Sequence, residues 1–230
     1  MRRILKNNYA ILAALLLAVA SLVGVACSTA PQTNLNNRNA ATTNTTPAGN
    51  MSNMNNMNHG TMGGMDHSNM QSSPNAASQP YDLQFIDTMV MHHQGAIDMA
   101  RMAVTKAQHA ELREMAQKVI TDQEREIAEL RRHREQWFAG RPQAMNMEMS
   151  GMMDSMRGMD MNRLNAATGN SFDLMFIDMM IPHHQGAVMM AREALQRAEH
   201  PELKQLAQQI IREQEREIAQ MNGWKNAWRQ

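Results

Sequence analysis

Two pairs of adjacent histidines are the residues of this sequence with the clearest capacity for chemistry. His92 and His93 begin the segment His-His-Gln-Gly-Ala, and His183 and His184 begin an identical segment 91 residues later. The apolar residues around each pair recur at helical spacing, and the second histidine of each pair falls on that apolar stripe. The first histidine lies about 100° round the helix, on the flank of the stripe. We therefore expect two imidazoles from each copy to face one bundle interior.

Methionines accompany both pairs. Met89 and Met180 come three and four residues before the histidines and project from the same helix face. Imidazoles and thioethers at one level of a bundle are typical of a metal site, and the soft sulfur favours Cu(I) over hard cations. The alternative, that these histidines only satisfy hydrogen bonds in the core, stays open. The candidate metal ligands are His92, His93, His183, His184, Met89, Met180, Met99, Met190, Met149, Met152, Met153 and Met156.

The helices that must position these residues come from an internal duplication. Residues 82–137 align without a gap on residues 173–228, and about half of the aligned positions are identical. Each copy contains one helical pattern, a break and a second helical pattern. Each two-helix copy exposes an apolar stripe that only the other copy can cover. The sequence therefore predicts an all-α fold over residues 80–230, a ferritin-like antiparallel four-helix bundle built from two duplicated helical hairpins.

The hairpin turns set polar side chains level with the histidines. If the first hairpin turns near Gln108, Gln123 lies opposite His93. The same spacing in the second copy sets Gln214 opposite His184. A buried amide there can fix which ring nitrogen is free to bind metal, or it can belong to a polar layer that only sets helix register.

Charge and composition exclude some functions and point to another. The formal net charge is zero, and no basic patch with interleaved aromatics is present, so nucleic acid is not an expected partner. The charged runs 124–129 and 213–217 alternate in sign at helical spacing, and we expect them to form solvated faces. The 26 methionines in 230 residues are several times the usage of an ordinary soluble chain. This excess calls for a specific role.

A methionine-rich linker, residues 141–170, joins the two repeats. If it were one helix, Met149, Met152, Met153, Met156 and Met159 would form a single stripe. Branched aliphatic residues are almost missing from the linker. Plain packing and thioether ligands for copper are both open interpretations of this stripe.

The N-terminal segment, residues 1–27, reads as a signal peptide. Basic residues precede an apolar run that ends at Cys27, the only cysteine. The preceding Gly24-Val25-Ala26 resembles a bacterial lipoprotein cleavage box, although that box prefers a branched residue where Gly24 stands. We expect an exported chain, in the periplasm or at the cell surface, held to the membrane through a lipid if Cys27 is modified. An uncleaved membrane anchor is the alternative.

Residues 28–79 are rich in Asn, Thr, Ser, Gly, Pro and Met and almost free of charge, which predicts a disordered tether. Methionines and histidines recur in it every two to five residues, as expected of a tract that binds soft metals. The secondary candidate ligands are Met51, Met54, Met57, His59, Met62, Met65, His67 and Met70.

The repeated motif resembles the ferritin-like family termed domain of unknown function 305, which includes the CopM-type periplasmic copper proteins. The likeness rests on the segment 176–187 and its earlier copy, on Met-Ser-Gly-Met-Met at 149–153, and on Ala-Thr-Gly at 167–169. It implies a four-helix bundle that binds copper, as Cu(I), through Met and His. The first copy has Met91 where the second has Pro182, so the ligand set can differ between copies.

The leading hypothesis is a non-enzymatic copper protein that sequesters or transfers Cu(I) in copper tolerance or homeostasis. A copper-handling partner protein would fit it, and the sequence does not identify one. One rival is a ferritin-like metal-dependent oxidase, which uses Glu-x-x-His pairs, and no glutamate here has a histidine three residues later. A haem-binding bundle and a purely structural surface lipoprotein are the other rivals. The structural role leaves the methionine excess unexplained.

Overall fold

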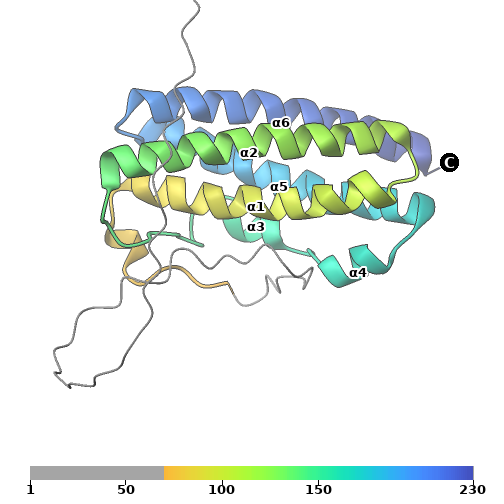
Figure 1. The fold of residues 1–230 in the computed structure, drawn as a ribbon, viewed down its shortest axis with the longest axis horizontal. Helices are drawn as coiled ribbons and strands as arrows, with labels where there is room; N and C mark the ends of the chain where they lie inside the picture. Colours follow the sequence, from red (N-terminus) through yellow and green to blue (C-terminus); the bar gives the residue numbers. More distant parts are fainter. Residues whose placement is uncertain (1–69, 230) are drawn as a thin grey trace, which may run out of the picture. The chain divides into compact units, whose positions relative to one another are not determined.

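The computed structural model describes residues 70–229. Four long helices dominate this part of the chain (Figure 1): α1 (Tyr81–Lys106), α2 (Ala110–Phe138), α5 (Gly169–Arg197) and α6 (Pro201–Trp228). Three short elements accompany them: η2 (Ala76–Ser78), α3 (Met152–Met156) and α4 (Met161–Ala166). The predicted all-α bundle of two duplicated hairpins is confirmed. The turns fall at residues 107–109 and 198–200, as the breaks in the sequence pattern predict.

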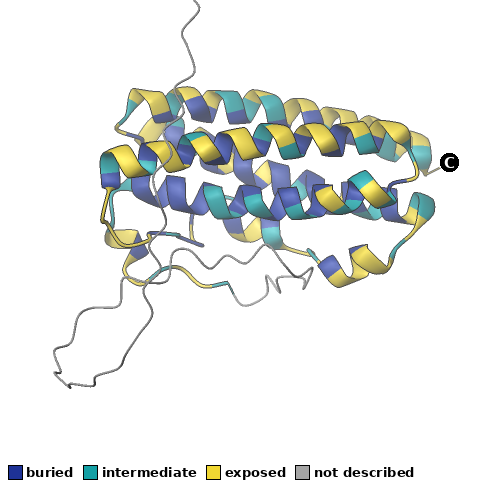
Figure 2. Cartoon of the chain, viewed as in Figure 1, coloured by how far each residue is buried: buried dark blue, intermediate teal, exposed yellow. Residues whose placement is uncertain are grey.

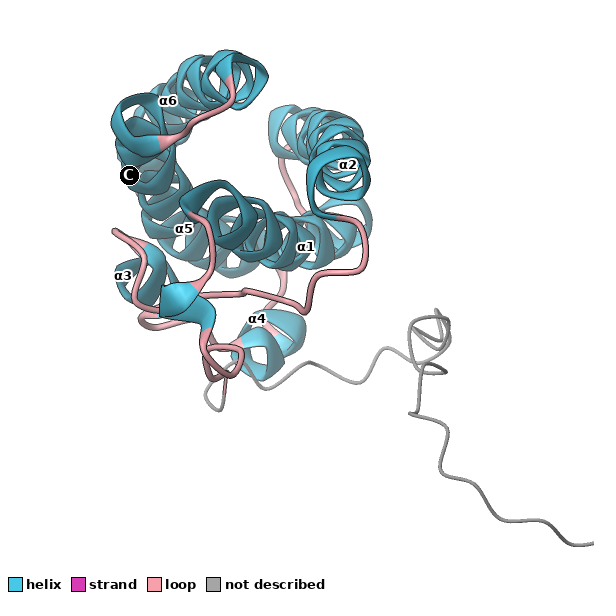
Figure 3. Ribbon diagram, turned by 90° about the vertical axis from the view of Figure 1, so that its left-hand side faces the viewer, coloured by secondary structure: helices cyan, strands magenta, loops and turns pink. Residues whose placement is uncertain are grey.

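The two hairpins meet through their first helices. Helix α1 packs on α2 and helix α5 packs on α6, while the contact between the repeats is made chiefly by α1 and α5. Figure 3 shows α1 and α5 side by side, with α2 and α6 on the flanks. The residues on the inner faces of the helices are the buried ones (Figure 2). The first helix of each repeat therefore carries the groups that can meet at the centre.

The core consists of two apolar clusters, one on each side of a polar layer. The first apolar cluster takes α1 up to Met89 and α5 from Ala187 onward. The second apolar cluster takes α1 from Ala96 onward and α5 up to Ile181. Both clusters also contain residues of α2 and α6, so each is completed by both repeats. The histidine pairs lie in the gap between the two clusters along the chain.

The folded part begins earlier than the sequence pattern suggests. Residues 70–79, assigned above to the tether, lie against the bundle. Met70 packs on the first apolar cluster, and the Ser73 amide donates a hydrogen bond of 2.8 Å to the Met145 carbonyl. The Gln84 amide also donates to the carbonyl of Gln79, at 2.6 Å. Specific hydrogen bonds hold this polar segment, which composition alone does not predict.

The methionine linker does not form one continuous stripe. Gly151 and Gly158 take positive φ angles, 80° and 79°, and interrupt the chain on either side of the five-residue helix α3. Met152 is fully buried in the first apolar cluster, whereas its neighbour Met153 is 62% exposed. Glycine adopts this backbone conformation without strain, which is why the helix stops there.

Within residues 70–229, no helix is long and apolar enough to cross a membrane. The predicted signal peptide, Cys27 and the tether ligands from Met51 to His67 lie outside the described residues.

Candidate metal centre

The four predicted histidines form one buried cluster at the level where α1 and α5 meet. His92 and His183 lie face to face, with ring centroids 3.7 Å apart and ring planes 33° apart. His93 and His184 each lie 6.3 Å, centroid to centroid, from the other histidine of their own pair. All four side chains are at most 1% exposed. The structure therefore brings together the histidines that the duplicated motif singles out.

Glycine at the next turn makes this close approach possible. A Cβ atom placed on Gly95 would lie 3.4 Å from Nε2 of His183, the nearest heavy atom outside its own helix. The missing side chain leaves room for the imidazole of the other repeat against the backbone of α1. The glycine in His-His-Gln-Gly-Ala thus serves the packing of the histidine layer.

Two buried carboxylates bind the second histidine of each pair. Nε2 of His93 lies 2.8 Å from Oε2 of Glu126, and Nε2 of His184 lies 2.9 Å from Oε2 of Glu217. Glu126 and Glu217 occupy equivalent positions in the two repeats. The expectation that the charged runs form solvated faces is wrong for these two residues, which are 2% and 3% exposed. The layer therefore contains four imidazoles and two carboxylates.

A signal for these carboxylates is present in the sequence. Val119, Gln123, Glu126 and Leu130 fall at heptad spacing on α2, and all four are buried. The alternating charges of the run mask this periodicity, because Glu126 stands among the charged residues Glu124, Arg125 and Glu129. The heptad spacing of α2 alone predicts that Glu126 faces the core.

The expected pairing of glutamine with histidine is not formed. Gln123 and Gln214 are buried, but their amide groups have no hydrogen-bond partner within the described residues. Side chains in a helix point toward its N-terminus. The side chain of His93 therefore points away from the hairpin turn. Side chains of α2 point toward that turn, so the partner of His93 must be a residue of α2 that lies further from the turn than His93 does. Glu126, one turn beyond Gln123, meets that condition.

This pairing fixes the chemistry of the imidazoles. Nε2 of His184 lies in hydrogen-bond geometry with Glu217, and if the carboxylate accepts there, Nδ1 of that ring carries the lone pair. Nε2 of His93 contacts Glu126 as an ion pair without hydrogen-bond geometry. Neither Nδ1 atom has a hydrogen-bond partner in the part of the chain that the structure describes. Metal-binding histidines are commonly oriented in this way by a carboxylate on the far nitrogen. Nδ1 of His184 is thus placed to offer its lone pair to a cation.

Burial keeps His92 neutral. It lowers the pKa of His92 well below the ordinary 6.5, the charges of His93 and His184 lower it further, and the backbone of His183 acts in the opposite direction. His92 is therefore an unprotonated imidazole at neutral pH, which is the form that binds metals.

The methionine candidates lie above and below the histidines. Met89 and Met190 belong to the first apolar cluster, and Met180 and Met99 belong to the second. All four are fully buried. Their thioethers therefore belong to the apolar clusters that border the layer, and their role as ligands stays a prediction.

The linker methionines fall into two groups. Met149 and Met152 are buried in the first apolar cluster, and Met156 packs against it. Met153 points away from the core. In residues 70–229, no group of three or more His, Cys, Asp or Glu side chains has an arrangement that could hold a metal ion as it stands. The donors present, neutral imidazoles and thioethers, suit a soft cation better than a hard one.

Comparison with solved structures finds close relatives. The chain is 45% identical to CopM in its Cu(I)-bound form, with a TM-score of 0.56, over 65% of this chain and 99% of CopM. CopM has also been solved bound to Cu(II) and to Ag. A DUF305 protein from Streptomyces coelicolor is 24% identical, with a TM-score of 0.58, over 67% of this chain and 96% of that chain, which supports the fold alone.

Among curated proteins, the chain is 42% identical over 51 residues to "Uncharacterized protein L153" of Acanthamoeba polyphaga mimivirus. That match covers 22% of this chain and only 34% of the viral protein. The sequence model of the family described as Domain of unknown function (DUF305) matches residues 30–134 and 132–225, one match for each repeat. The chain therefore belongs to the DUF305 family.

Proposed function

We propose that this protein binds copper as Cu(I) outside the cytoplasm, sequestering it or passing it on in copper tolerance or homeostasis without a catalytic step. The proposal is supported by CopM, which has been solved with Cu(I), Cu(II) and Ag. The match to the Cu(I)-bound form covers 99% of the CopM chain. The signal-like N-terminal sequence ending at Cys27 supports export, with anchoring through a lipid if Cys27 is modified.

One observation carries the proposal: four buried imidazoles lie between two apolar clusters, and carboxylates hold two of them by Nε2. Copper as Cu(I) takes imidazole and thioether ligands without needing a negative charge from the protein. In this arrangement Glu126 and Glu217 orient His93 and His184, and His92 stays neutral. The apolar clusters keep water away from the layer and supply thioethers at its borders.

The buried carboxylates also favour a second candidate, a ferritin-like metal-dependent oxidase. In that class glutamates project into the bundle and bind the metal themselves. Here one oxygen of Glu126 and one of Glu217 are each already engaged by an imidazole. That engagement makes the carboxylates orienting partners, which favours the copper binder.

The test is anaerobic Cu(I) titration against a competing chelator, with His93→Gln and His184→Gln combined. Glutamine keeps an amide donor near each buried carboxylate, so the double variant removes the imidazoles without leaving Glu126 and Glu217 unpaired. We expect loss of the tightest Cu(I) equivalent and of the rise in melting temperature that copper gives by binding the native state.

His133→Gln is the matched control, because His133 is buried on α2 outside the layer and stacks on Trp137. It should leave the tightest equivalent unchanged. Parental Cu(I) affinity in the double variant would overturn the assignment of the histidine layer. Tight binding of Fe(II) by the parent, with Cu(I) bound only weakly, would favour the oxidase.

A further inference from the structure

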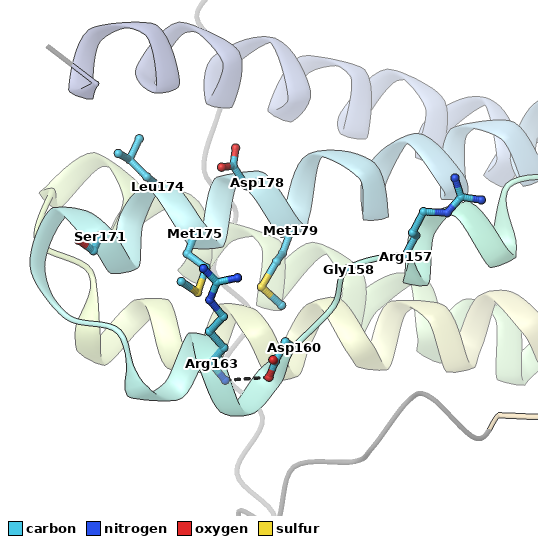
Figure 4. Close-up of a pocket in the computed structure, with 9 residues that line it drawn as sticks. All are labelled: Arg157, Gly158, Asp160, Arg163, Ser171, Leu174, Met175, Asp178 and Met179. Carbon is cyan, nitrogen blue, oxygen red and sulfur yellow. Dashed lines mark hydrogen bonds between the residues drawn. The ribbon is translucent and has the colours of Figure 1, made fainter.

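A cavity lies between the methionine linker and α5, away from the histidine layer. It has a volume of about 410 Å³ and is lined by Arg157, Gly158, Asp160, Arg163, Ser171, Leu174, Met175, Asp178 and Met179. In Figure 4 the thioethers of Met175 and Met179 both extend from α5 toward α4, on the same side of the helix. Their spacing of four residues places the two sulfur atoms on adjacent turns.

In the first repeat, the positions equivalent to Met175 and Met179 hold the linker by hydrogen bonds. Gln84 and Thr88 of α1 are the equivalents of Met175 and Met179. There the linker docks by hydrogen bonds: the Asn146 side-chain amide donates to Oε1 of Gln84 at 2.8 Å, and its backbone amide donates to Oγ1 of Thr88 at 2.9 Å. All three residues are buried and the contact is closed.

In the second repeat both polar residues are replaced by methionine, and the linker passes over them with a cavity in between. Met179 is buried in the second apolar cluster, and Met175 packs against its edge. Met159 of the linker packs against the same cluster. Two thioethers thus line the cavity where the other repeat uses an amide and a hydroxyl. A contact that only packed the linker on α5 would leave little open space beside these thioethers.

The charges around the cavity are mixed. Arg157 pairs with Asp154 at 2.9 Å, and the carboxylate of Asp160 accepts a hydrogen bond from the Arg163 backbone amide at 2.8 Å. Asp178 pairs with cations of α6 and of the C-terminal residues. The Arg163 side chain is exposed and faces Met175 (Figure 4). A monovalent cation held by neutral thioethers meets less repulsion here than a divalent one.

We propose that this cavity is a second metal site, which binds a soft monovalent cation, Cu(I) or Ag(I), through the thioethers of Met175 and Met179. The site shares no residue with the histidine layer. It can therefore be tested independently of the proposed function of that layer.

The test is Ag(I) titration of the full chain labelled with ¹³C at the methionine methyl groups, followed by NMR. The resonances of Met175 and Met179, identified by their loss in Met175→Leu and Met179→Leu, should shift together as Ag(I) is added. Combining both substitutions should remove one bound equivalent. Leucine nearly conserves the volume of methionine, so the fold should be kept.

Met189→Leu is the matched control, because Met189 lies on the same helix, is 45% exposed and does not line the cavity. It should leave the stoichiometry unchanged. Arg163→Gln removes the facing cation and should raise Ag(I) affinity at this site. In the variant with His93→Gln and His184→Gln, the Met175 and Met179 shifts should persist.

Unmoved Met175 and Met179 resonances at Ag(I) concentrations that saturate other methionines would overturn the second site, whatever happens at the histidines. If Met179→Leu disturbs the buried cluster, Met175→Leu alone decides, because Met175 lies at the cluster edge. Met175→Leu should weaken Ag(I) binding at this site and leave the melting temperature of the metal-free chain unchanged. Parental Ag(I) binding in Met175→Leu would also overturn the site.

Discussion

Asp82, at the start of the first repeat, binds His200, at the start of the last helix of the second repeat. Oδ2 of Asp82 lies 2.6 Å from Nδ1 of His200 and accepts the His200 backbone amide at 3.0 Å. The His200 ring stacks on Trp137, with centroids 3.8 Å apart. Asp173 makes the same contact to His109, whose ring stacks on Trp228. Each repeat therefore caps the second helix of the other.

Asp82→Ala should lower the free energy of unfolding by about 1 to 3 kcal/mol, because it removes a buried acceptor that serves two backbone amides and an imidazole. Urea denaturation followed by circular dichroism measures this change. Asp178→Ala is the matched control, since Asp178 is exposed and its surface ion pairs should contribute less than about 1 kcal/mol. Equal effects of the two substitutions would contradict the capping role.

The two equivalent glycines of the repeated motif should differ sharply on substitution. A Cβ on Gly186 would lie 2.4 Å from Cβ of Ser155 and 2.6 Å from the Gly151 carbonyl oxygen. Gly186→Ala should therefore displace α3 from α5. Gly95→Ala should keep the fold, because its nearest neighbour is the His183 ring at 3.4 Å.

Limited proteolysis of the linker measures whether α3 stays docked in the two variants. We expect cleavage near α3 to accelerate in Gly186→Ala and to stay at the parental rate in Gly95→Ala. Equal protection in both variants would show that the linker does not depend on the close approach at Gly186.

The duplicated pattern predicts much of this fold. The helix ends at Lys106 and Arg197 and the meeting of the four histidines follow from apolar periodicity and from the repeat itself. The carboxylates of the layer were missed because the direction of side chains along a helix, and not residue level alone, decides which partner His93 meets. The docking of residues 70–79 depends on single hydrogen bonds to distant residues, which have no periodic signal.

Acid should destabilise the copper-free bundle through His92. Burial holds its pKa in the folded chain below the ordinary 6.5, so the unfolded chain takes up a proton that the folded chain does not. Stability from this group is complete above about pH 6.5 and falls as the pH drops below it, by about 1.4 kcal/mol per pH unit.

His92→Leu should flatten that dependence and raise stability in mild acid, since leucine needs no hydrogen-bond partner. Urea denaturation of both copper-free proteins between pH 7.5 and 5 provides the comparison. The same substitution should weaken Cu(I) binding. A parental pH dependence in His92→Leu would show that His92 is not held neutral by the fold.

Anomalous diffraction at the copper edge, from crystals of the chain loaded with one equivalent of Cu(I), tests the histidine layer most directly. We expect one strong peak within bonding distance of Nδ1 of His93 or His184, with Glu126 and Glu217 still in contact with Nε2 of those rings. Peaks confined to the methionine thioethers, with all four imidazoles in their metal-free positions, would contradict it.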